Sequence, residues 1–560
     1  MWQYVFFVFV GYAAWSYVTL QRNYKRASSM GIPLVRIPVD GLNVPWQVLG
    51  ALVFKVLDGI TSQTLPTYIR YTRRGWFWND KAQSHLRYGS IWATVTPKTT
   101  WVQLGDPDAV YDLFSRKADF IRPYENFKPL ELYGPNILTV DAQQWPRHRK
   151  LVASPLNESI MKFVWKESTK QAKQMIATWA DGDISSVAED TRTVSLNVLA
   201  ATGFRKSFDF QSKVADTAKT DVTTSSTYRD ALCTVLDNII LLLVLPAQVL
   251  SLPYLPQSFN VIGKAAVDFR KHMERMLQEE TASVENGEQG SGGIMTSFVR
   301  ALKVSGSSSG GSMKSRGLTV EELIGNVFLI NFAGHDTTAN TFAFAFYLLA
   351  SEPKVQQWLA EELDTVTNDD KDWDYEHLYP SLVRCRAVLY ETLRMYPPAL
   401  ALPKHTPTTP QRLQVGDREI VIPANVHVQP SLLALHMHPQ YWVEPEKWNP
   451  QRWITRASEE GADKDKAREA LVKPRRGTYF PWSEGPMNCP GRKFSEVEFT
   501  AVISCLMRTH RLSIVRNSDE SEMQARQRVR EVVNDCDNQM LLKMRDPGRV
   551  RLRCEVTTGL

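Results

Sequence analysis

Paired cysteines, zinc-finger spacings and a strong charge of either sign are all missing from this sequence. Its six cysteines lie far apart, and none forms a CxxC pair. They do not make a disulfide framework, and free cysteines suit a reducing compartment. The formal charge is only +6 and the basic residues are dispersed, so nothing favours nucleic acid as a partner.

A dinucleotide-binding signature is also absent, because no convincing GxGxxG follows a strand-like segment. No flavin or nicotinamide domain is therefore visible. With 560 residues, the chain exceeds the roughly 250–300 at which a single hydrophobic core usually stops growing. Its length fits several domains, or one large, mostly helical domain with appendages.

Long uninterrupted apolar runs are scarce, and the clearest is Trp2–Leu20, which carries no charged residue. As a helix it would rise about 28 Å, close to the hydrocarbon thickness of a bilayer. Arg22, Lys25 and Arg26 follow at once, so the positive-inside rule predicts a lumenal N-terminus and a cytosolic remainder. A cleaved signal peptide would need charged residues before the run and a small-residue cleavage site after it, and the sequence has neither. Residues 1–20 are therefore interpreted as an uncleaved transmembrane anchor.

Composition divides the remainder into a linker and one catalytic domain. Residues 21–63 contain several prolines and are predicted to be a stiff linker, followed by the domain at 64–560. Val44–Leu57, within the linker, could lie on a membrane surface or form a core helix. Leu236–Tyr254 is apolar but broken by a proline, which favours a core helix or a loop dipping into the bilayer over a second span. Gly and Ser dominate 286–317, which is predicted to be a flexible insertion without core-forming capacity.

Hydrophobic periodicity predicts many helices and a few short strands. Helical spacing covers 107–115, 158–180, 187–201, 319–351 and 382–395, whereas alternation predicts strands within 88–104 and 420–428. The segment around 534–542 is expected to return a loop to the substrate site. The predicted fold class is mostly α with small β-sheets.

Cys489 lies in a Gly/Pro-rich loop, PWSEGPMNCPG, just before a segment of helical periodicity. Gly485 and Gly491 flank the cysteine and let the backbone approach a flat ligand closely. A thiol near a helix N-terminus is favoured as thiolate, and a thiolate on a rigid loop is a good axial ligand for haem iron. For a lone cysteine, the alternative is an ordinary loop residue.

The hexapeptide Ala-Gly-His-Asp-Thr-Thr at 333–338 interrupts a helix that is otherwise apolar on nearly every face. Glycine costs up to about 1 kcal/mol relative to alanine in a helix interior, and an unpaired buried carboxylate costs more. Such local conflicts are typical of functional positions. The alternative is a threonine bonded to the preceding turn beside a solvated aspartate.

Two further elements place polar side chains on single helix faces. Trp145 and Arg149 are four apart, and both can donate hydrogen bonds to one carboxylate. Glu391 and Arg394 are three apart and can pair, although such a spacing alone signals nothing. In isolation, both elements would be interpreted as surface features.

Taken together and in order, these elements resemble the signatures of the cytochrome P450 family. The resemblance runs from about residue 64 to the end and covers W-x-x-x-R, [AG]-G-x-[DE]-T-T, and E-x-x-R with the later segment PEKWNPQRW, at Trp145, Arg149, 333–338, Glu391, Arg394 and Arg452. The family's cysteine pattern, F-x-x-G-x-R-x-C-x-G, is matched at the cysteine and both glycines. It departs at Trp482, which replaces Phe, and at Met487, which replaces Arg.

The resemblance implies a cytochrome P450 fold with a long central helix over a buried haem b. Cys489 would be the axial iron ligand on the loop shaped by Trp482, Gly485 and Gly491. Trp145, Arg149 and either Lys404 or His405 would bind the haem propionates, because Met487 cannot donate the bond that an arginine would. Glu391, Arg394 and Arg452 would form a buried network behind the haem.

The implied activity is reductive activation of dioxygen to oxidise an apolar small molecule. Thr337 would hydrogen-bond dioxygen or its ordered water at the iron, and Asp336 would help relay protons. Electrons would come from NADPH through a separate membrane-bound reductase, with cytochrome b5 as a second candidate donor. Arg492 and Lys493, beside the cysteine loop, are candidates for docking that reductase or simply solvated helix-start residues.

The cysteine loop resembles fungal members most, many of which decorate secondary metabolites, and the anchor implies the endoplasmic reticulum membrane. Two alternatives remain at this stage. A haem-thiolate isomerase or dehydratase would need no reductase, and the intact Asp336 and Thr337 count against it. A non-enzymatic haem-binding protein is the other.

Overall fold

The computed structural model describes residues 2–41, 43, 46, 50, 52–56, 67–180, 182–205, 207–210, 228–286, 292–306, 317–367, 373–457, 468–538 and 540–557. They form two compact units. The first comprises Met1–Pro123, Tyr390–Cys489 and Val532–Asp546, and the second comprises Tyr124–Leu389, Pro490–Glu531 and Pro547–Leu560. The assignment of residues 64–560 to a single catalytic domain stays a prediction.

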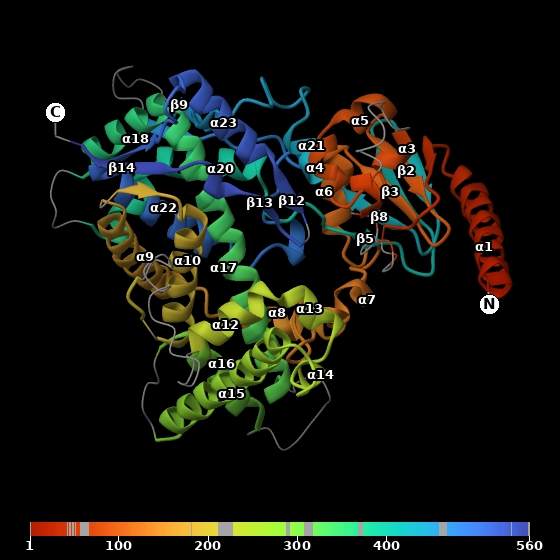
Figure 1. The fold of residues 1–560 in the computed structure, drawn as a ribbon, viewed down its shortest axis with the longest axis horizontal. Coiled ribbons are helices and arrows are strands. Elements are labelled where there is room, and N and C mark those ends of the chain that lie inside the picture. The colour runs from red at the N-terminus through yellow and green to blue at the C-terminus, as the bar shows by residue number, and fades with distance from the viewer. Residues whose placement is uncertain are drawn as a thin grey trace. The chain divides into compact units, whose positions relative to one another are not determined.

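A five-stranded sheet with the order β1-β2-β3-β8-β5 forms the centre of the first unit (Figure 1). Its strands are β1 (Leu34–Arg36), β2 (Ile91–Val95), β3 (Thr100–Leu104), β8 (His427–Pro430) and β5 (Lys404–His405). β2 and β3 are antiparallel neighbours, as the alternation within 88–104 predicts. β8 lies parallel to β3 and antiparallel to β5, so the sheet joins distant parts of the sequence. Val95, Val102 and Val428 are fully buried in its core.

The prediction of one strand over 420–428 is wrong, because two strands share that segment. β7 (Arg418–Ile422) pairs with β6 (Gln411–Val415) in a hairpin, whereas β8 belongs to the large sheet. Pro423 lacks the N–H that a continuing ladder needs, and Asn425 has a left-handed backbone with φ of 54°. The chain therefore turns between the two strands.

Helix α6 (Pro107–Ser115) has the bounds that the sequence predicts. The carboxylate of Asp106 accepts a hydrogen bond from the Ala109 N–H at 2.9 Å, and Pro107 occupies the first turn, where its missing N–H costs nothing. The other elements of this unit are α1 (Trp2–Ser28), α3 (Thr67–Arg70), α4 (Trp76–Asp80), α5 (Gln83–Tyr88), α21 (Leu432–His436), η3 (Pro450–Trp453), β9 (Ile454–Ala457), β10 (Arg468–Leu471), η5 (Gly485–Met487), β12 (Cys536–Asn538) and β13 (Leu542–Met544).

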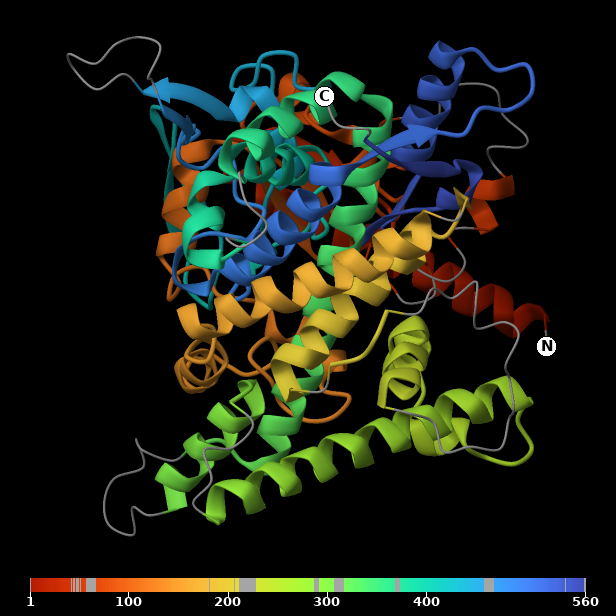
Figure 2. The same ribbon diagram turned by 90° about the vertical axis from the view of Figure 1, so that its left-hand side faces the viewer.

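The second unit is mainly helical. Its core elements are α9 (Glu158–Trp179), α10 (Val187–Phe204), α17 (Val320–Ser351) and α22 (Arg492–Thr509), with α9 packed on α22 and α10 on α17 (Figure 2). The remaining elements are α7 (Tyr124–Phe127), η1 (Lys128–Leu130), α8 (Trp145–Ala153), α12 (Tyr228–Asp237), α13 (Ile239–Val244), α14 (Ala247–Leu250), α15 (Gln257–Glu285), α16 (Ile294–Gly306), α18 (Pro353–Val366), α19 (Tyr375–Ser381), η6 (Pro547–Arg549) and a small sheet ordered β11 (His510–Ile514), β14 (Leu552–Val556), β4 (Asp183–Ile184). Helices α20 (Val383–Met395) and α23 (Glu522–Asn534) continue from one unit into the other. The predicted class, mostly α with small β-sheets, is confirmed.

Helix α17 begins with a capping box. The Thr319 hydroxyl accepts a hydrogen bond from the Glu322 N–H at 3.2 Å, and the Glu322 carboxylate accepts one from the Thr319 N–H at 2.7 Å. Most of the helix is buried, but burial is interrupted near its middle, where Ala333 is exposed and Thr337 is partly exposed. The polar hexapeptide therefore lies where one face of this otherwise buried helix is partly open.

The prediction that 286–317 has no core-forming capacity is wrong for residues 294–306, which form α16. Four apolar side chains of this helix are buried, namely Ile294, Met295, Phe298 and Val299. They recur at helical spacing within the Gly/Ser-rich stretch, and this spacing is a stronger signal than the average composition. Residues 287–291 and 307–316 lie outside the described part of the chain.

Helix α1 extends to Ser28, beyond the predicted anchor at 1–20. The predicted linker is wrong for 21–36, because no proline interrupts 21–28 and Leu34–Arg36 joins the sheet as β1. Half of Val44–Leu57 lies outside the described residues. Among the helices that the structure describes, none combines the length and apolarity needed to cross a bilayer.

Candidate functional site

Backbone geometry fixes the loop that presents Cys489. The Cys489 N–H donates a hydrogen bond to the Trp482 carbonyl at 2.7 Å, which closes a turn containing η5. Ser483 and Gly485 both have left-handed backbones, with φ of 62° and 70°. A Cβ atom at position 485 would lie 2.6 Å from the Phe114 carbonyl oxygen. Only glycine fits there, so the loop shape depends on this residue.

Cys489 is the only exposed cysteine of the six. Burial raises the pKa of the Cys505 thiol to about 11 and that of Cys554 to about 12, and it also raises the pKa of Cys385 and Cys536. A thiolate is the form that coordinates iron, so these four buried thiols are poor ligands. An accessible cysteine on a rigid loop fits haem-iron ligation.

Aromatic side chains connect the cysteine loop to the rest of its unit. The ring of Trp482 packs edge-on against Tyr390 at 5.9 Å and Tyr479 at 6.5 Å between centroids. Tyr479 in turn contacts Trp453 at 4.6 Å and stacks on His436 at 5.1 Å. A tryptophan in place of the family's phenylalanine thus remains a packing residue here.

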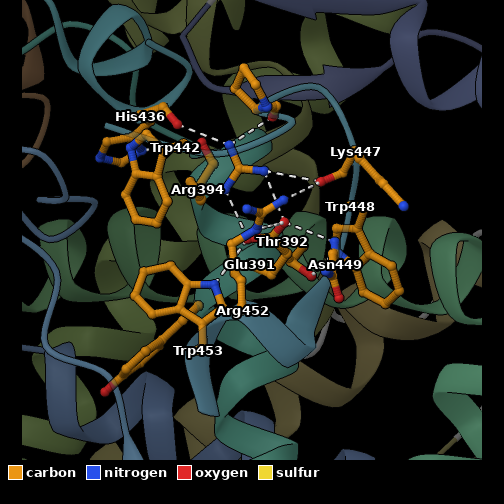
Figure 3. Close-up of polar contacts among 12 residues, drawn as sticks. Glu391, Thr392, Arg394, His436, Trp442, Lys447, Trp448, Asn449, Arg452 and Trp453 are labelled. Carbon is orange, nitrogen blue, oxygen red and sulfur yellow. Dashed lines mark hydrogen bonds and ion pairs between the residues drawn. The ribbon is translucent and has the colours of Figure 1, made fainter. Parts of the chain in front are cut away.

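Glu391, Arg394 and Arg452 meet in one buried network (Figure 3). Arg394 donates two hydrogen bonds to the Glu391 carboxylate, each 2.8 Å, and Arg452 donates one of 3.0 Å. The Trp453 indole and the Asn449 N–H donate to the same carboxylate at 2.9 and 2.8 Å. Glu391 and Arg394 are fully buried. Five donors therefore satisfy one carboxylate that water does not reach.

The arginines of this network also bind the backbone of the segment before η3. Arg394 donates to the carbonyls of His436 and Pro445 at 2.9 and 2.8 Å, and Arg452 donates to that of Val443 at 2.7 Å. Because guanidinium groups carry several fixed donors, they can hold carboxylate and carbonyl acceptors together. The network therefore fixes a loop as well as an ion pair.

Lys404 and His405 point to different neighbours, as successive residues of a strand must. The Lys404 ammonium lies 3.7 Å from the Met487 sulfur and 5.7 Å from the centre of the Phe114 ring. Only 5% of Lys404 is exposed, and no carboxylate among the described residues pairs with it. The His405 ring instead faces that of His427, with 6.0 Å between centroids.

The electrostatics of Lys404 suit an anionic ligand. Burial, with a smaller contribution from the nearby positive charge of Arg122, lowers the pKa of its ammonium to about 8. A buried ammonium facing a thioether and an aromatic ring is poorly compensated. A bound carboxylate would compensate it, whereas burial lowers the pKa of His405 and keeps that ring neutral. Of the two predicted propionate contacts, Lys404 fits better.

Asp336 is tied into an ion-pair network that includes a residue from another helix. Its carboxylate accepts a hydrogen bond from Arg192 of α10 at 2.8 Å and lies 3.2 Å from Nε2 of His335. Arg192 also donates to Asp237 of α12 at 2.7 Å. Despite burial, His335 and Arg192 hold the pKa of Asp336 well below its usual range. The carboxyl is thus kept ionised.

The Thr337 hydroxyl donates to the Ala333 carbonyl one turn earlier, at 2.8 Å. This is the back-bonding that the sequence offered as the alternative to a functional role. The side chain nevertheless lies on the partly exposed face of α17. Rotation about χ1 would break this hydrogen bond to Ala333 and release the hydroxyl for a ligand on that face.

Trp145 and Arg149 both lie on α8, and Trp145 is 5% exposed whereas Arg149 is partly buried. The neighbouring His148 fixes this helix. Its Nδ1 lies 2.9 Å from the Asn326 amide, and its Nε2 lies 3.4 Å from Glu322 at the start of α17. The roles of Trp145 and Arg149 at the propionates stay predictions.

Glu498 is a buried titratable group that sequence reasoning missed. It lies on α22, is 1% exposed, and has one carboxylate oxygen without a hydrogen-bond partner among the described residues. Burial raises its pKa to about 8, with the Ser195 hydroxyl lowering it in part. The carboxyl is therefore neutral at physiological pH. The only sequence signal was an acid within an apolar helical repeat.

Glu498→Gln is expected to change how stability depends on pH. A carboxyl whose folded-state pKa is raised contributes stability below its unfolded-state pKa and loses it as pH rises through the folded-state pKa. Between pH 6 and 8, the wild type should lose about 2 kcal/mol relative to the glutamine variant, because the slope of about 1.4 kcal/mol per pH unit falls to half at the folded-state pKa. Urea unfolding at both pH values measures this. Ser195→Ala should enlarge the pH dependence, and parallel curves for wild type and Glu498→Gln would contradict the prediction.

Comparisons with known proteins bear on these residues as a set. The family model described as Cytochrome P450 matches residues 67–538. A cytochrome P450 monooxygenase of Arthrobotrys oligospora is 27% identical, with 90% of both chains covered. The phomenoic acid biosynthesis cluster cytochrome P450 monooxygenase of Leptosphaeria maculans is 28% identical over 88% of this chain and 89% of that protein.

The haem domain of cytochrome P450DA has the same fold, with a TM-score of 0.65, 17% identity, and coverage of 88% of this chain and 96% of that one. At that identity the structure supports the fold alone. The family model includes the Cys489 loop, the polar segment of α17 and the Glu391 network. Since this match spans most of the sequence and the curated relatives are enzymes, the chain belongs to the cytochrome P450 family and is a cytochrome P450 monooxygenase.

Proposed function

We propose that this enzyme holds haem b through the Cys489 thiolate and oxidises an apolar small molecule with NADPH-derived electrons supplied by a separate reductase. The observation that carries this proposal is the accessible cysteine on a loop whose turn only Gly485 can make. When bound, the haem supplies dioxygen activation, which an anionic sulfur ligand favours. The family implies a redox partner and a small-molecule substrate.

The chain's own residues would bind and orient the cofactor. Cys489 would supply the sulfur ligand of the iron, and Lys404 places a positive charge next to Met487, where the family has a propionate-binding arginine. Trp145 and Arg149 are proposed to donate to the same carboxylates. Because Gly485 and Gly491 have no Cβ atoms, the loop would let a flat cofactor approach its backbone closely.

Thr337 and Asp336 are proposed to handle protons on the open face of α17. Asp336 stays ionised because of its bonds to Arg192 and His335, so it can accept a proton only when one of them moves. Arg192 already shares its guanidinium with Asp237 and can stay paired there. The Thr337 hydroxyl would then pass a proton towards the substrate side.

Thr337→Ala is expected to retain haem but to uncouple NADPH oxidation from product formation. We expect product per NADPH to fall at least about tenfold, which is less than the full contribution of a positioned proton-transfer group because water can substitute in part. Product and NADPH consumption are measured together. Thr338→Ala is the matched control, because Thr338 makes the same kind of bond, to Gly334 at 3.2 Å, but is buried. Full coupling in Thr337→Ala would contradict the proton-transfer role.

Lys404→Met is expected to weaken haem retention. Loss of a buried charge-assisted hydrogen bond costs about 1.5–3 kcal/mol, which corresponds to roughly tenfold to a hundredfold faster haem loss. The rate of haem transfer to an apoprotein acceptor measures this without any turnover. Lys404→Met combined with Met487→Arg should recover retention, because the charge returns on the neighbouring side chain. A haem-loss rate for Lys404→Met equal to that of the wild type would refute the role of Lys404.

The requirement for electrons separates the proposed activity from its alternatives. Turnover that needs NADPH and an added reductase supports the proposal, whereas turnover with a hydroperoxide substrate alone supports an isomerase or dehydratase. A non-enzymatic haem protein would show neither. Displacement of an iron-bound water by substrate, followed as a spectral shift, identifies the apolar compounds that bind.

The fungal relatives suggest a biosynthetic substrate. The relative from Leptosphaeria maculans is assigned to a phomenoic acid biosynthesis cluster. We therefore propose that the substrate is an intermediate of secondary metabolism. A binding screen of apolar metabolites followed by product analysis tests this.

We also propose attachment to the endoplasmic reticulum membrane, with the catalytic residues in the cytosol and cytochrome b5 as a further donor. Helix α1 exposes several large apolar side chains, among them Tyr4, Phe6, Phe7 and Trp15. In the segment 236–254, Ile240, Val244 and Tyr254 are also exposed, which favours membrane contact over a purely core position. Deletion of residues 2–20 should release the protein from the membrane fraction.

A further inference from the structure

Met487 carries an oxidisable sulfur in the loop that presents Cys489. It ends the short helix η5, two residues before the cysteine, at the position where the cytochrome P450 pattern has an arginine. Its side chain is partly exposed. The Met487 sulfur lies 3.7 Å from the Lys404 ammonium, and both residues belong to the first compact unit. A thioether therefore contacts the ammonium for which a propionate is the proposed partner.

The other surroundings of Lys404 offer its ammonium little. Lys404 is 5% exposed, and its ammonium faces the Phe114 ring, 5.7 Å from the ring centre. A thioether sulfur is only a weak hydrogen-bond acceptor. The contact with Met487 therefore competes little with a bound carboxylate, as long as the sulfur stays a thioether.

Two other methionines provide a comparison. The Met437 sulfur also contacts a cation, at 3.2 Å from Arg394, but Met437 is only 4% exposed and Arg394 already binds Glu391. Met523, on α23, is 78% exposed. These two residues serve as internal references for a buried and an accessible thioether.

Oxidation would change what the Met487 sulfur offers to Lys404. Methionine sulfoxide is polar, whereas the thioether is apolar. An N–H···O hydrogen bond spans about 2.7–3.2 Å, so an oxygen bonded to a sulfur that lies 3.7 Å from the ammonium comes within its reach. A hydrogen bond donated by an ammonium is stronger than one between neutral groups. The sulfoxide oxygen would therefore compete with a propionate for Lys404.

We propose that Met487 is a modification site for peroxide, and that its conversion to the sulfoxide captures the Lys404 ammonium and weakens the binding of haem. The inference rests on the proposed contact between Lys404 and a haem propionate. The oxidant is hydrogen peroxide, which a monooxygenase releases when reduced dioxygen leaves without reacting with the substrate. An enzyme that consumes NADPH without forming product would in this way loosen its own cofactor.

The oxidation balances with hydrogen peroxide alone. The sulfur lone pair forms a bond to one peroxide oxygen, the O–O bond breaks, and the second oxygen leaves as water with the proton that the first oxygen gives up. Sulfur loses two electrons and peroxide gains them. The Lys404 ammonium would donate a hydrogen bond to the leaving oxygen. Methionine sulfoxide reductase reverses the change.

The test treats the full-length holoenzyme with hydrogen peroxide, removes the excess with catalase and maps oxidised methionines by peptide mass. Oxidation of Met523 shows that the treatment was effective, and we expect one added oxygen at Met487 sooner than at Met437. Transfer of the intact haem that remains to an apoprotein acceptor should become roughly tenfold faster, because the propionate loses a charge-assisted hydrogen bond. Haem that peroxide destroys does not enter this rate. Treatment with methionine sulfoxide reductase should restore the slow transfer.

Two variants make the result specific. Met487→Leu keeps an apolar side chain of similar size, so its haem transfer should be equally fast before and after peroxide. Lys404→Leu should transfer haem quickly before treatment and no faster after it.

Three results would overturn the inference. They are oxidation of Met487 no faster than that of Met437, oxidation of Met487 without a change in haem transfer, and a response of Met487→Leu equal to that of the wild type. A wild-type rate in untreated Lys404→Leu would instead refute the propionate contact itself, and that result is obtained before any peroxide is added.

Discussion

Cys489→Ala is expected to abolish monooxygenase activity and the red-shifted Soret band of the reduced carbon monoxide complex. Alanine offers no donor atom, and no other cysteine is exposed. The four buried thiols have raised pKa values, so none of them supplies a thiolate in its place. Absorption spectra of the purified variant measure the effect directly.

Two control variants make this result specific. Cys233→Ala removes a half-buried thiol and should leave the spectrum unchanged. Gly485→Ala keeps the sulfur but disturbs the loop, because the new Cβ would lie 2.6 Å from the Phe114 carbonyl oxygen. We expect Gly485→Ala to lower haem content while any retained haem keeps the thiolate spectrum. An unchanged Soret band in Cys489→Ala would refute the ligand assignment.

Much of the fold was predictable because local patterns decide local structure. The helix over 107–115 follows from Asp106 and Pro107 at its start, and the long helix over 319–351 follows from its capping box and continuous apolar run. The strands within 88–104 follow from alternation. The prediction failed where average composition was used in place of residue spacing. The stretch 286–317 is rich in Gly and Ser as a whole, yet it contains helix α16.

The site was predictable only in part, because motifs identify residues but not their distant partners. Arg192 holds Asp336 from 144 positions away, and no local pattern indicates that contact. The choice between Lys404 and His405 depends on which face of β5 meets Met487, which a two-residue strand cannot reveal by itself. Glu498 was overlooked because its burial comes from the packing of α22 rather than from its neighbours in sequence.

Glu391→Gln is expected to destabilise the protein by about 3–5 kcal/mol, the range for breaking a buried ion pair by removing one partner. The substitution keeps the size of the side chain but removes its charge. Arg394, which is fully buried, and Arg452 would then lack their counter-ion. Against a total stability of about 5–15 kcal/mol, this loss is a large fraction, so the variant should unfold at a clearly lower urea concentration than the wild type.

A smaller change at the same carboxylate separates loss of charge from loss of one hydrogen bond. Trp453→Phe removes only the indole donor at 2.9 Å, so we expect a cost of about 1 kcal/mol. Urea unfolding of both variants, together with their soluble yield, compares the two costs. Equal losses of unfolding free energy would mean that the negative charge of Glu391 contributes no more than an ordinary hydrogen-bond acceptor. A much larger cost for Glu391→Gln would mean that its charge holds both arginines in place, and through them the backbone of Pro445 and Val443.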